Sequence, residues 1–349
     1  MMFTTCMDNF PEGVVLLGSD RVLYANTMAV HYLPQLTAQA PIPAELDLPW
    51  SEDCGAGVFS AGLTTYTFSH SRTPEGTVLF FRPAPQTALT DLQLDGALQQ
   101  LRAFLGEFAM EIGPYSAPGA SPVSPAALAD FSKSYHRAFR LLNNLDYLRQ
   151  AATPEGVPFT PAALDLADLC AQLTQSAAPL LEQTGTRLEF QCSLPVLLTR
   201  GDVALLRTLL LGLIANSAQA ARGGQIVLRL QRRGNRALLH LSDSGAPLSQ
   251  RELAALLQQD NDHSLPLPGQ GAGLGLTVAR HIVSLHQGAF LMEWGDCAPS
   301  TLIALPISSD LPHATAKTPS PDTAGGLDPL LVGLADVLPA DLFGLEGLE

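Results

Sequence analysis

Four glycines stand within the seven residues Gly269 to Gly275, at the start of the apolar-periodic stretch GQGAGLGLTVARHIVSLHQG (residues 269–288). Glycine costs roughly 1 kcal/mol relative to alanine inside a helix, so helix formation alone does not favour this cluster. A loop that lets a ligand approach its backbone favours glycine, and the free N–H groups at a helix start attract anions such as phosphate. The stretch indicates either a phosphate-binding loop or a flexible loop before an ordinary helix.

Two common phosphate motifs do not fit this loop. The dinucleotide fingerprint G-x-G-x-x-G fails in both registers, because its last position falls on Leu274 or on Leu276. A P-loop requires Gly-Lys followed by Ser or Thr, and the cluster contains no lysine. A ligand bound here must use a third arrangement.

Two further stretches that carry polar groups precede the loop. The sequence LLRTLLLGLIANSAQAA (205–221) predicts an apolar helix with Asn216 at the edge of its buried face. The sequence RALLHLSDSG (236–245) predicts a strand whose alternation puts Asp243 on the same side as apolar residues. A buried carboxylate needs a partner, and the amino group of adenine is a suitable donor. An ordinary turn residue in "DSG" is the simpler interpretation of Asp243.

The composition limits what kind of protein holds these residues. The chain has 349 residues, enough for two or three domains, and 46% of them are hydrophobic. A net charge of −14 argues against nucleic acid as a direct partner. The five cysteines never form C-x-x-C, which predicts reduced thiols and no zinc site. With no signal-like leader and no uninterrupted apolar run of about 18 residues, we expect a soluble cytoplasmic protein.

Residues 1–88 are predicted to form a small α+β module. The stretch at 10–34 predicts a strand, a tight turn, a second strand and a short helix after Asn26, and GTVLFFRPAP (76–85) predicts a closing strand. This pattern resembles a PAS sensory domain, whose opening hairpin often ends in an asparagine just before its first helix. An unrelated small α+β domain is the alternative.

Residues 89–152 are predicted to form a helical hairpin. Its apolar residues alternate in spacings of four and three, which is typical of a heptad seam. The seam residues are Leu94, Leu98, Leu101, Leu105, Phe108 and Ile112 on the first helix, and Leu128, Phe131, Tyr135, Ala138, Leu142 and Leu145 on the second. Pairing of two hairpins into a dimeric four-helix bundle would bury both seams. Packing against neighbouring domains of the same chain is the alternative.

The rest of the chain divides into a third domain and a tail. Residues 160–308, which follow a proline-containing linker, carry both helix and strand signals. Residues 309–349 are predicted to be a disordered acidic tail. Its leucine-rich end, LDPLLVGLADVLPADLFGLEGLE, is suited to dock on a partner or on the protein's own body.

The order of the motifs in the third domain resembles the ATP-binding domain of the GHKL superfamily, in the form carried by sensor histidine kinases. The resemblance covers residues 160–307 and implies an α/β sandwich within an α+β multidomain protein. It implies that Asn216 helps to coordinate Mg²⁺ between the phosphates. It further implies that Asp243 binds the adenine amino group and that Gly245 gives the ring close access to the backbone.

The same resemblance assigns roles to the glycine cluster and to the region before it. Residues 246–268 would be the mobile ATP lid, and the phosphates would be lined by Gly271, Gly273 and Gly275. The cofactors implied are ATP and Mg²⁺, and the reaction implied is transfer of the γ-phosphoryl group to a histidine. The partners implied are a second copy of the chain and a response regulator or other signalling protein.

Several positions depart from the family pattern. Gly212 stands four residues before Asn216, where gyrase-like ATPases and anti-sigma serine kinases carry a glutamate as general base. A serine kinase or an ATPase is therefore disfavoured. Pro247 replaces a glycine and predicts a stiffer lid hinge, because proline has a fixed φ and no N–H. Gln219 and Ala220 replace the basic and aromatic residues common in active kinases.

The largest departure is the absence of an acceptor histidine from the first hairpin helix. No histidine occurs between His70 and His136. His136, beside the seam residue Tyr135 on the second helix, is expected to be solvated and is the one acceptor candidate in the hairpin. His281 and His286 are expected to be structural. Two functions follow: a histidine kinase, or a pseudokinase that acts as a nucleotide-responsive interaction scaffold.

Overall fold

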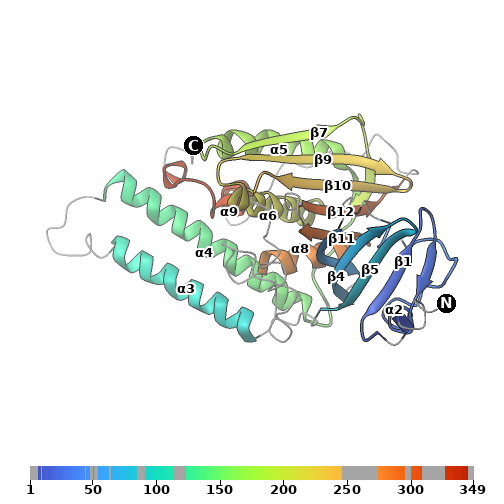
Figure 1. The fold of residues 1–349 in the computed structure, drawn as a ribbon. Helices are drawn as coiled ribbons and strands as arrows, with labels where there is room; N and C mark the ends of the chain where they lie inside the picture. The colour runs from blue at the N-terminus through green and yellow to red at the C-terminus, as the bar shows by residue number, and fades with distance from the viewer. Residues whose placement is uncertain are drawn as a thin grey trace.

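The computed structural model describes residues 7–8, 10–43, 45–47, 50, 54–62, 64–84, 91–112, 123–245, 274–294, 300–308 and 327–344. Within them, ten strands form one continuous sheet in the order β2-β1-β5-β4-β3-β11-β12-β10-β9-β7 (Figure 1). Neighbouring strands are antiparallel apart from the pair β7 and β9. The sheet therefore joins the N-terminal module to the third domain.

The N-terminal module contributes half of this sheet. Its elements are β1 (Gly13–Leu17), β2 (Val22–Ala25), α2 (Thr27–Tyr32), β3 (Cys54–Ala61), β4 (Thr64–Thr73) and β5 (Gly76–Pro83). The predicted hairpin, short helix and closing strand are present. Asn26 caps α2, and its Oδ1 accepts hydrogen bonds from the N–H groups of Ala29 (2.8 Å) and Val14 (2.9 Å). The likeness to a PAS domain stays a prediction.

The third domain supplies the other five strands and three helices. Its elements are β6 (Ala162–Asp165), α5 (Leu166–Glu182), β7 (Arg187–Cys192), β8 (Leu198–Gly201), α6 (Val203–Ala221), β9 (Gln225–Arg233), β10 (Arg236–Asp243), α8 (Leu274–Leu285), β11 (Ala289–Trp294) and β12 (Ser300–Pro306). β6 and β8 pair in a separate two-stranded sheet. Helices α5, α6 and α8 share one apolar core with Leu239 and Leu241 of β10, while Leu238 packs into the core of the N-terminal module.

The two halves of the sheet meet where β3 pairs with β11. Gly57 of β3 lies opposite Glu293, and a Cβ added to Gly57 would overlap the carbonyl oxygen of Met292. Buried His70 of β4 hydrogen-bonds to Glu293 across the same junction. The junction therefore depends on a glycine and on a buried polar pair.

The hairpin consists of α3 (Asp91–Ile112) and α4 (Pro125–Ala151), which lie side by side in Figure 1. Leu101 and Phe108 of the first seam are partly buried against the main core. Other seam residues are exposed in this single chain: Leu94, Leu98, Leu105, Tyr135 and Leu142. One hairpin therefore buries only part of the two predicted seams.

The C-terminal end corrects a prediction. Residues 327–344 are ordered, with α9 (Pro329–Leu334) and the 3₁₀ helix η4 (Ala340–Phe343), so the expectation of disorder over 309–349 is wrong for this part. The reason is that its apolar side chains, such as fully buried Leu338, find a surface in the main core. The remainder of the predicted tail lies outside the described residues.

A histidine fixes the start of α6 against α8. The N–H of Asp202, the N-cap of α6, donates to His286 Nε2 (2.9 Å), and His286 Nδ1 lies 2.8 Å from the carbonyl oxygen of Ile282. Nε2 accepts a hydrogen bond, so the ring must be neutral with its proton on Nδ1. His286 is therefore structural, as its sequence position suggested.

Stability should fall as the pH is lowered from about 7 to 5. Burial lowers the pKa values of His240, His281 and His286 below the usual value of about 6.5. The unfolded chain therefore binds more protons below this pH, and protonation favours unfolding. We expect the melting temperature of His286→Gln to fall less over this range than that of the wild type. Parallel pH curves for the two proteins would contradict this role.

Candidate functional site

The two side chains predicted to bind the nucleotide lie near the end of one helix and at the end of one strand. Asn216 is half-buried on α6, five residues before the helix ends at Ala221; the C-cap residue Arg222 has a left-handed φ of 46°. Asp243 is the last residue of β10, and its carboxylate accepts a hydrogen bond from Ser217, the neighbour of Asn216. The structure therefore brings Asn216 and Asp243 to the same edge of the domain.

Asp243 is a buried carboxylate with unused acceptor capacity. Asp243 is 9% exposed, and burial raises the pKa of its carboxyl group. Hydrogen bonds from the Gly245 N–H (2.9 Å to Oδ1) and from Ser217 act to lower this pKa. A carboxylate offers about four lone-pair sites, so these two donors leave acceptor positions open. Such a group suits a ligand that presents an amino group.

Gly245 lies so close to this carboxylate that a side chain would not fit in the same backbone conformation. A Cβ at this position would lie 2.6 Å from Asp243 Oδ1 and 3.1 Å from the carbonyl oxygen of Ala220. Ser244 holds the turn in place, because its Oγ accepts a hydrogen bond from the Gln225 N–H (2.9 Å). The backbone therefore turns tightly beside the carboxylate and carries no side chain there, and the open acceptor positions of Asp243 fit the amino group of an adenine base.

The phosphate end of the predicted site is described only in part. Gly275 lies in the first turn of α8, where N–H groups are free to bind an anion, and no described atom lies within 4 Å of an added Cβ. α8 packs against α6, the helix that carries Asn216. Gly271, Gly273 and the lid at 246–268 lie outside the described residues.

The residues one turn before and one turn after Asn216 on α6 are not general bases. Gly212, one turn earlier on α6, is half-buried, and no described atom lies within 4 Å of a Cβ added there. One turn later, Gln219 Oε1 is buried and finds no hydrogen-bond partner among the described residues. Gly212 therefore leaves room for a ligand on this part of α6, and Gln219 supplies an acceptor without a partner among the described residues. Neither residue can deprotonate water.

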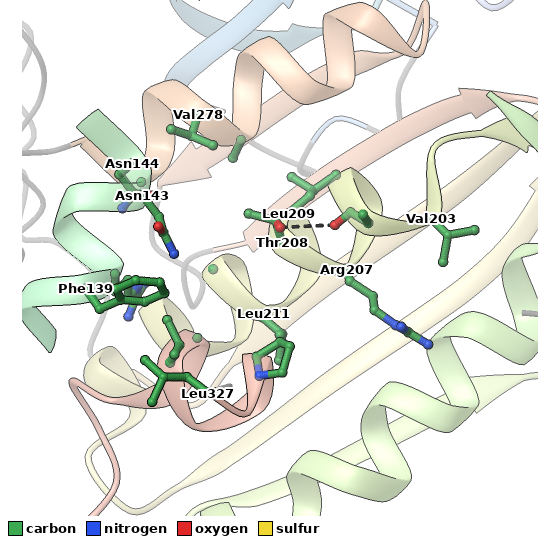
Figure 2. Close-up of a pocket in the computed structure, with 18 residues that line it drawn as sticks. Phe139, Asn143, Asn144, Val203, Arg207, Thr208, Leu209, Leu211, Val278 and Leu327 are labelled. Carbon is green, nitrogen blue, oxygen red and sulfur yellow. Dashed lines mark hydrogen bonds between the residues drawn. The ribbon is translucent and has the colours of Figure 1, made fainter. Parts of the chain in front are cut away.

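A cavity of about 370 Å³ adjoins this site on the side of the hairpin. It lies between α4, α6, α8 and α9, and Figure 2 shows Asn143 and Phe139 of α4 on one side of it and Leu209 and Thr208 of α6 on another. Gly212 and Gly275 line it, whereas Asn216 and Asp243 do not. The cavity is therefore separate from the adenine end and connects the start of α8 with the hairpin.

His136 is not solvated, which corrects the expectation for this residue. It is 5% exposed, its Nδ1 lies 2.7 Å from the carbonyl oxygen of Ser132, and its ring packs edge-on against Phe343 of η4 at 5.0 Å. The C-terminal segment covers it. Heptad spacing alone gave no sign of this contact, because the covering residue is 207 positions away in the chain.

Sequence reasoning missed two further contacts. The Ser217 hydroxyl tethers Asp243 to α6, and a serine directly after Asn216 was the one local signal for this. Tyr147 Oη of α4 lies 2.9 Å from His281 Nδ1 of α8 and fixes the third domain to the hairpin. Both contacts position the site and neither reaches its ligand.

Comparisons with known proteins agree with this site. Residues 201–305 match the family model "Histidine kinase-, DNA gyrase B-, and HSP90-like ATPase". The chain is 34% identical over 109 residues to the circadian input-output histidine kinase CikA of Synechococcus elongatus, a match covering 30% of this chain and 14% of that protein. It is 26% identical over 176 residues to the sensor histidine kinase CusS of Escherichia coli O157:H7, covering 49% of this chain and 35% of that protein. The chain thus spans about a third or less of the length of these two relatives.

The solved structures include similar chains as well. The histidine kinase AdeS of Acinetobacter baumannii aligns with 62% of this chain and 98% of its own, at 13% identity and a TM-score of 0.46. Among the described helices, α6 alone is long and apolar enough to cross a membrane, and half of its apolar window is buried inside the protein. The family model covers the helix with Asn216, the strand with Asp243 and the glycine cluster, so residues 201–305 form an ATPase domain of this family, similar to that of sensor histidine kinases.

Proposed function

We propose that this protein binds ATP·Mg²⁺ between α6, the end of β10 and the start of α8, as a cytoplasmic signalling protein of the histidine kinase type. The observation that carries the proposal is the Asp243 carboxylate, which is buried and has open acceptor positions at the tight turn formed with Gly245. Among the described residues, the two groups that donate to this carboxylate, the Gly245 N–H and the Ser217 hydroxyl, are both neutral.

Each residue has a defined part in holding the nucleotide. Asp243 would accept a hydrogen bond from the adenine amino group, and the Asn216 side-chain oxygen would hold Mg²⁺. The N–H groups at the start of α8 would bind phosphate oxygens, together with the glycine cluster before it. Bound Mg²⁺ would neutralise phosphate charge, which is the main electrostatic requirement of phosphoryl transfer.

The inherited reaction is transfer of the γ-phosphoryl group to a histidine. Transfer requires a nucleophile held in line with the phosphate, and α3 contains no imidazole. The one imidazole of the hairpin, His136, is buried and packs against Phe343. These two observations favour a second candidate function: a nucleotide-responsive scaffold that signals through protein contacts. Gly212 argues against a serine kinase or an ATPase, since it offers no general base.

We expect little or no phosphoryl label on the chain after incubation with γ-labelled ATP and Mg²⁺. The assay is a search for acid-labile label on the wild type and on His136→Gln. Absence of label in both proteins, with ATP binding shown separately, supports the scaffold. Strong label that is lost in His136→Gln would instead establish an active kinase with a displaced acceptor.

We propose that the hairpin forms a homodimer and that a response regulator or other signalling protein is a further partner. The exposed seam residues support the dimer, because a free hairpin would leave Leu98 and Leu105 in water. Leu105→Glu should weaken the dimer by placing an unpaired charge in the seam.

Light scattering over a dilution series measures this effect. Met110→Glu is the matched control, because Met110 is 80% exposed and lies off the seam. A monomeric wild type, or equal dissociation of both variants, would show that the seam does not mediate dimerisation.

A further inference from the structure

The C-terminal segment, residues 327–344, takes no part in the proposed nucleotide site, yet it packs on two parts of the protein at once. α9 contacts α6 of the ATP-binding domain and α4 of the hairpin, and η4 contacts α4 (Figure 1). The segment therefore binds both the ATP-binding domain and the hairpin.

Apolar side chains anchor the segment. Leu334, Ala335 and Leu338 are fully buried, and Phe343 is 4% exposed. Gly333 lies so close to α6 that a Cβ added to it would be 3.1 Å from Leu211. Burial of several large apolar side chains is a strong, non-directional driving force for this contact.

The carboxylate of Asp336 fixes the position of the segment along α4. Asp336 accepts hydrogen bonds from Arg137 Nε at 3.2 Å and from Arg140 Nη1 at 2.8 Å, both on α4. The Arg140 side chain is only 15% exposed. Hydrogen bonds between ionised, partly buried groups are about twice as strong as neutral ones.

Arg137 is also held in place from the other side. Its guanidinium lies over the Phe104 ring of α3, 4.8 Å from the centroid, and its Nη1 is 3.8 Å from Glu107 Oε2. The two arginines therefore present their donors to Asp336 from fixed positions. Such pre-organisation lowers the entropic cost of binding a carboxylate.

The charges of the surface and the segment are complementary. Residues 327–344 contain three acidic residues, Asp328, Asp336 and Asp341, and no lysine or arginine. The receiving surface on α4 carries Arg137 and Arg140. The surface thus combines an apolar floor with two guanidinium groups, and it selects an acidic segment with apolar side chains on one face.

We infer that the surface around Arg137, Arg140 and Leu211 is a recognition site for a short, acidic, leucine-rich helical segment, and that the chain's own residues 327–344 occupy it. The docked segment holds the hairpin and the ATP-binding domain in one arrangement. It also forms a wall of the cavity next to Gly212. An acidic helix of another protein would compete for the same surface and release this restraint.

Hydrogen exchange on the intact full-length chain tests the inference. Asp336→Lys replaces the shared carboxylate with a like charge and should raise the exchange rate of α9 amides about tenfold or more, with parallel increases in the facing part of α4. Asp341→Lys is the matched control, because it makes the same charge change on an exposed residue of the same segment. Combining Asp336→Arg with Arg140→Asp should restore much of the protection.

A second measurement uses a synthetic peptide of residues 327–344 added to the full-length protein. The peptide should compete with the docked segment, increase exchange of α9 and bind more weakly at high salt. Equal exchange in the wild type and Asp336→Lys, or equal effects of Asp336→Lys and Asp341→Lys, would overturn the inference. Neither readout depends on ATP, so failure of the proposed nucleotide site would leave this test unaffected.

Discussion

Asp243→Asn should weaken ATP binding by about 5- to 150-fold, because the new amide can turn a donor toward the donor of the adenine amino group. A buried donor left without an acceptor costs about 1–3 kcal/mol, and each 1.4 kcal/mol is a factor of ten in affinity. The shape of the residue changes little, so the loss would be specific to the hydrogen bond. Titration calorimetry with ATP and Mg²⁺ measures the change.

Asp146→Asn is the control for this substitution. Asp146 is an exposed residue of α4 that pairs with Arg149, and the same loss of charge there should leave the affinity unchanged. Equal ATP affinity in the wild type and Asp243→Asn would overturn the assignment of the adenine site.

Gly57→Ala should separate the two halves of the sheet. The added methyl group would overlap the carbonyl oxygen of Met292 on β11, so the backbone of one strand must move. Overpacking of this kind costs about 1–3 kcal/mol, and a larger cost is expected where the obstacle is backbone rather than a flexible side chain. The measurements are the melting temperature and hydrogen exchange of the β3 and β11 amides.

Gly106→Ala provides the matched control, because Gly106 lies in α3 with no described atom within 4 Å of an added Cβ. Alanine favours the helix there by up to about 1 kcal/mol, so this variant should be as stable as the wild type or more so. If Gly57→Ala were equally stable and kept the protection of β11, the shared sheet would be wrong.

Features set by local pattern were predictable from the sequence. The alternation in β10 put Asp243 on the same side as Leu239 and Leu241, and the structure buries all three. Helix periodicity put Asn216 at the edge of the buried face, where it is half-exposed. The heptad spacing predicted both hairpin helices, and the turn signals predicted the opening β-hairpin with Asn26 as the cap.

Features set by distant contacts were not predictable. The pairing of β3 with β11 joins residues more than 200 positions apart, and only the bare backbone of Gly57 makes room for it. His136 has the sequence surroundings of a surface helix residue, yet Phe343 covers it. The same holds for Asp336, whose partners on α4 are specified by tertiary packing and not by spacing. Local propensity cannot report such contacts, because their geometry exists only in the folded chain.

ATP binding between α6, β10 and α8 can be detected by hydrogen exchange of the full-length protein with and without saturating ATP and Mg²⁺. We expect protection at the end of α6 around Asn216, at the end of β10 around Asp243 and in the first turns of α8, with no change in β1 or β5. Protection confined to other segments, or none at all at a concentration where calorimetry detects binding, would contradict it.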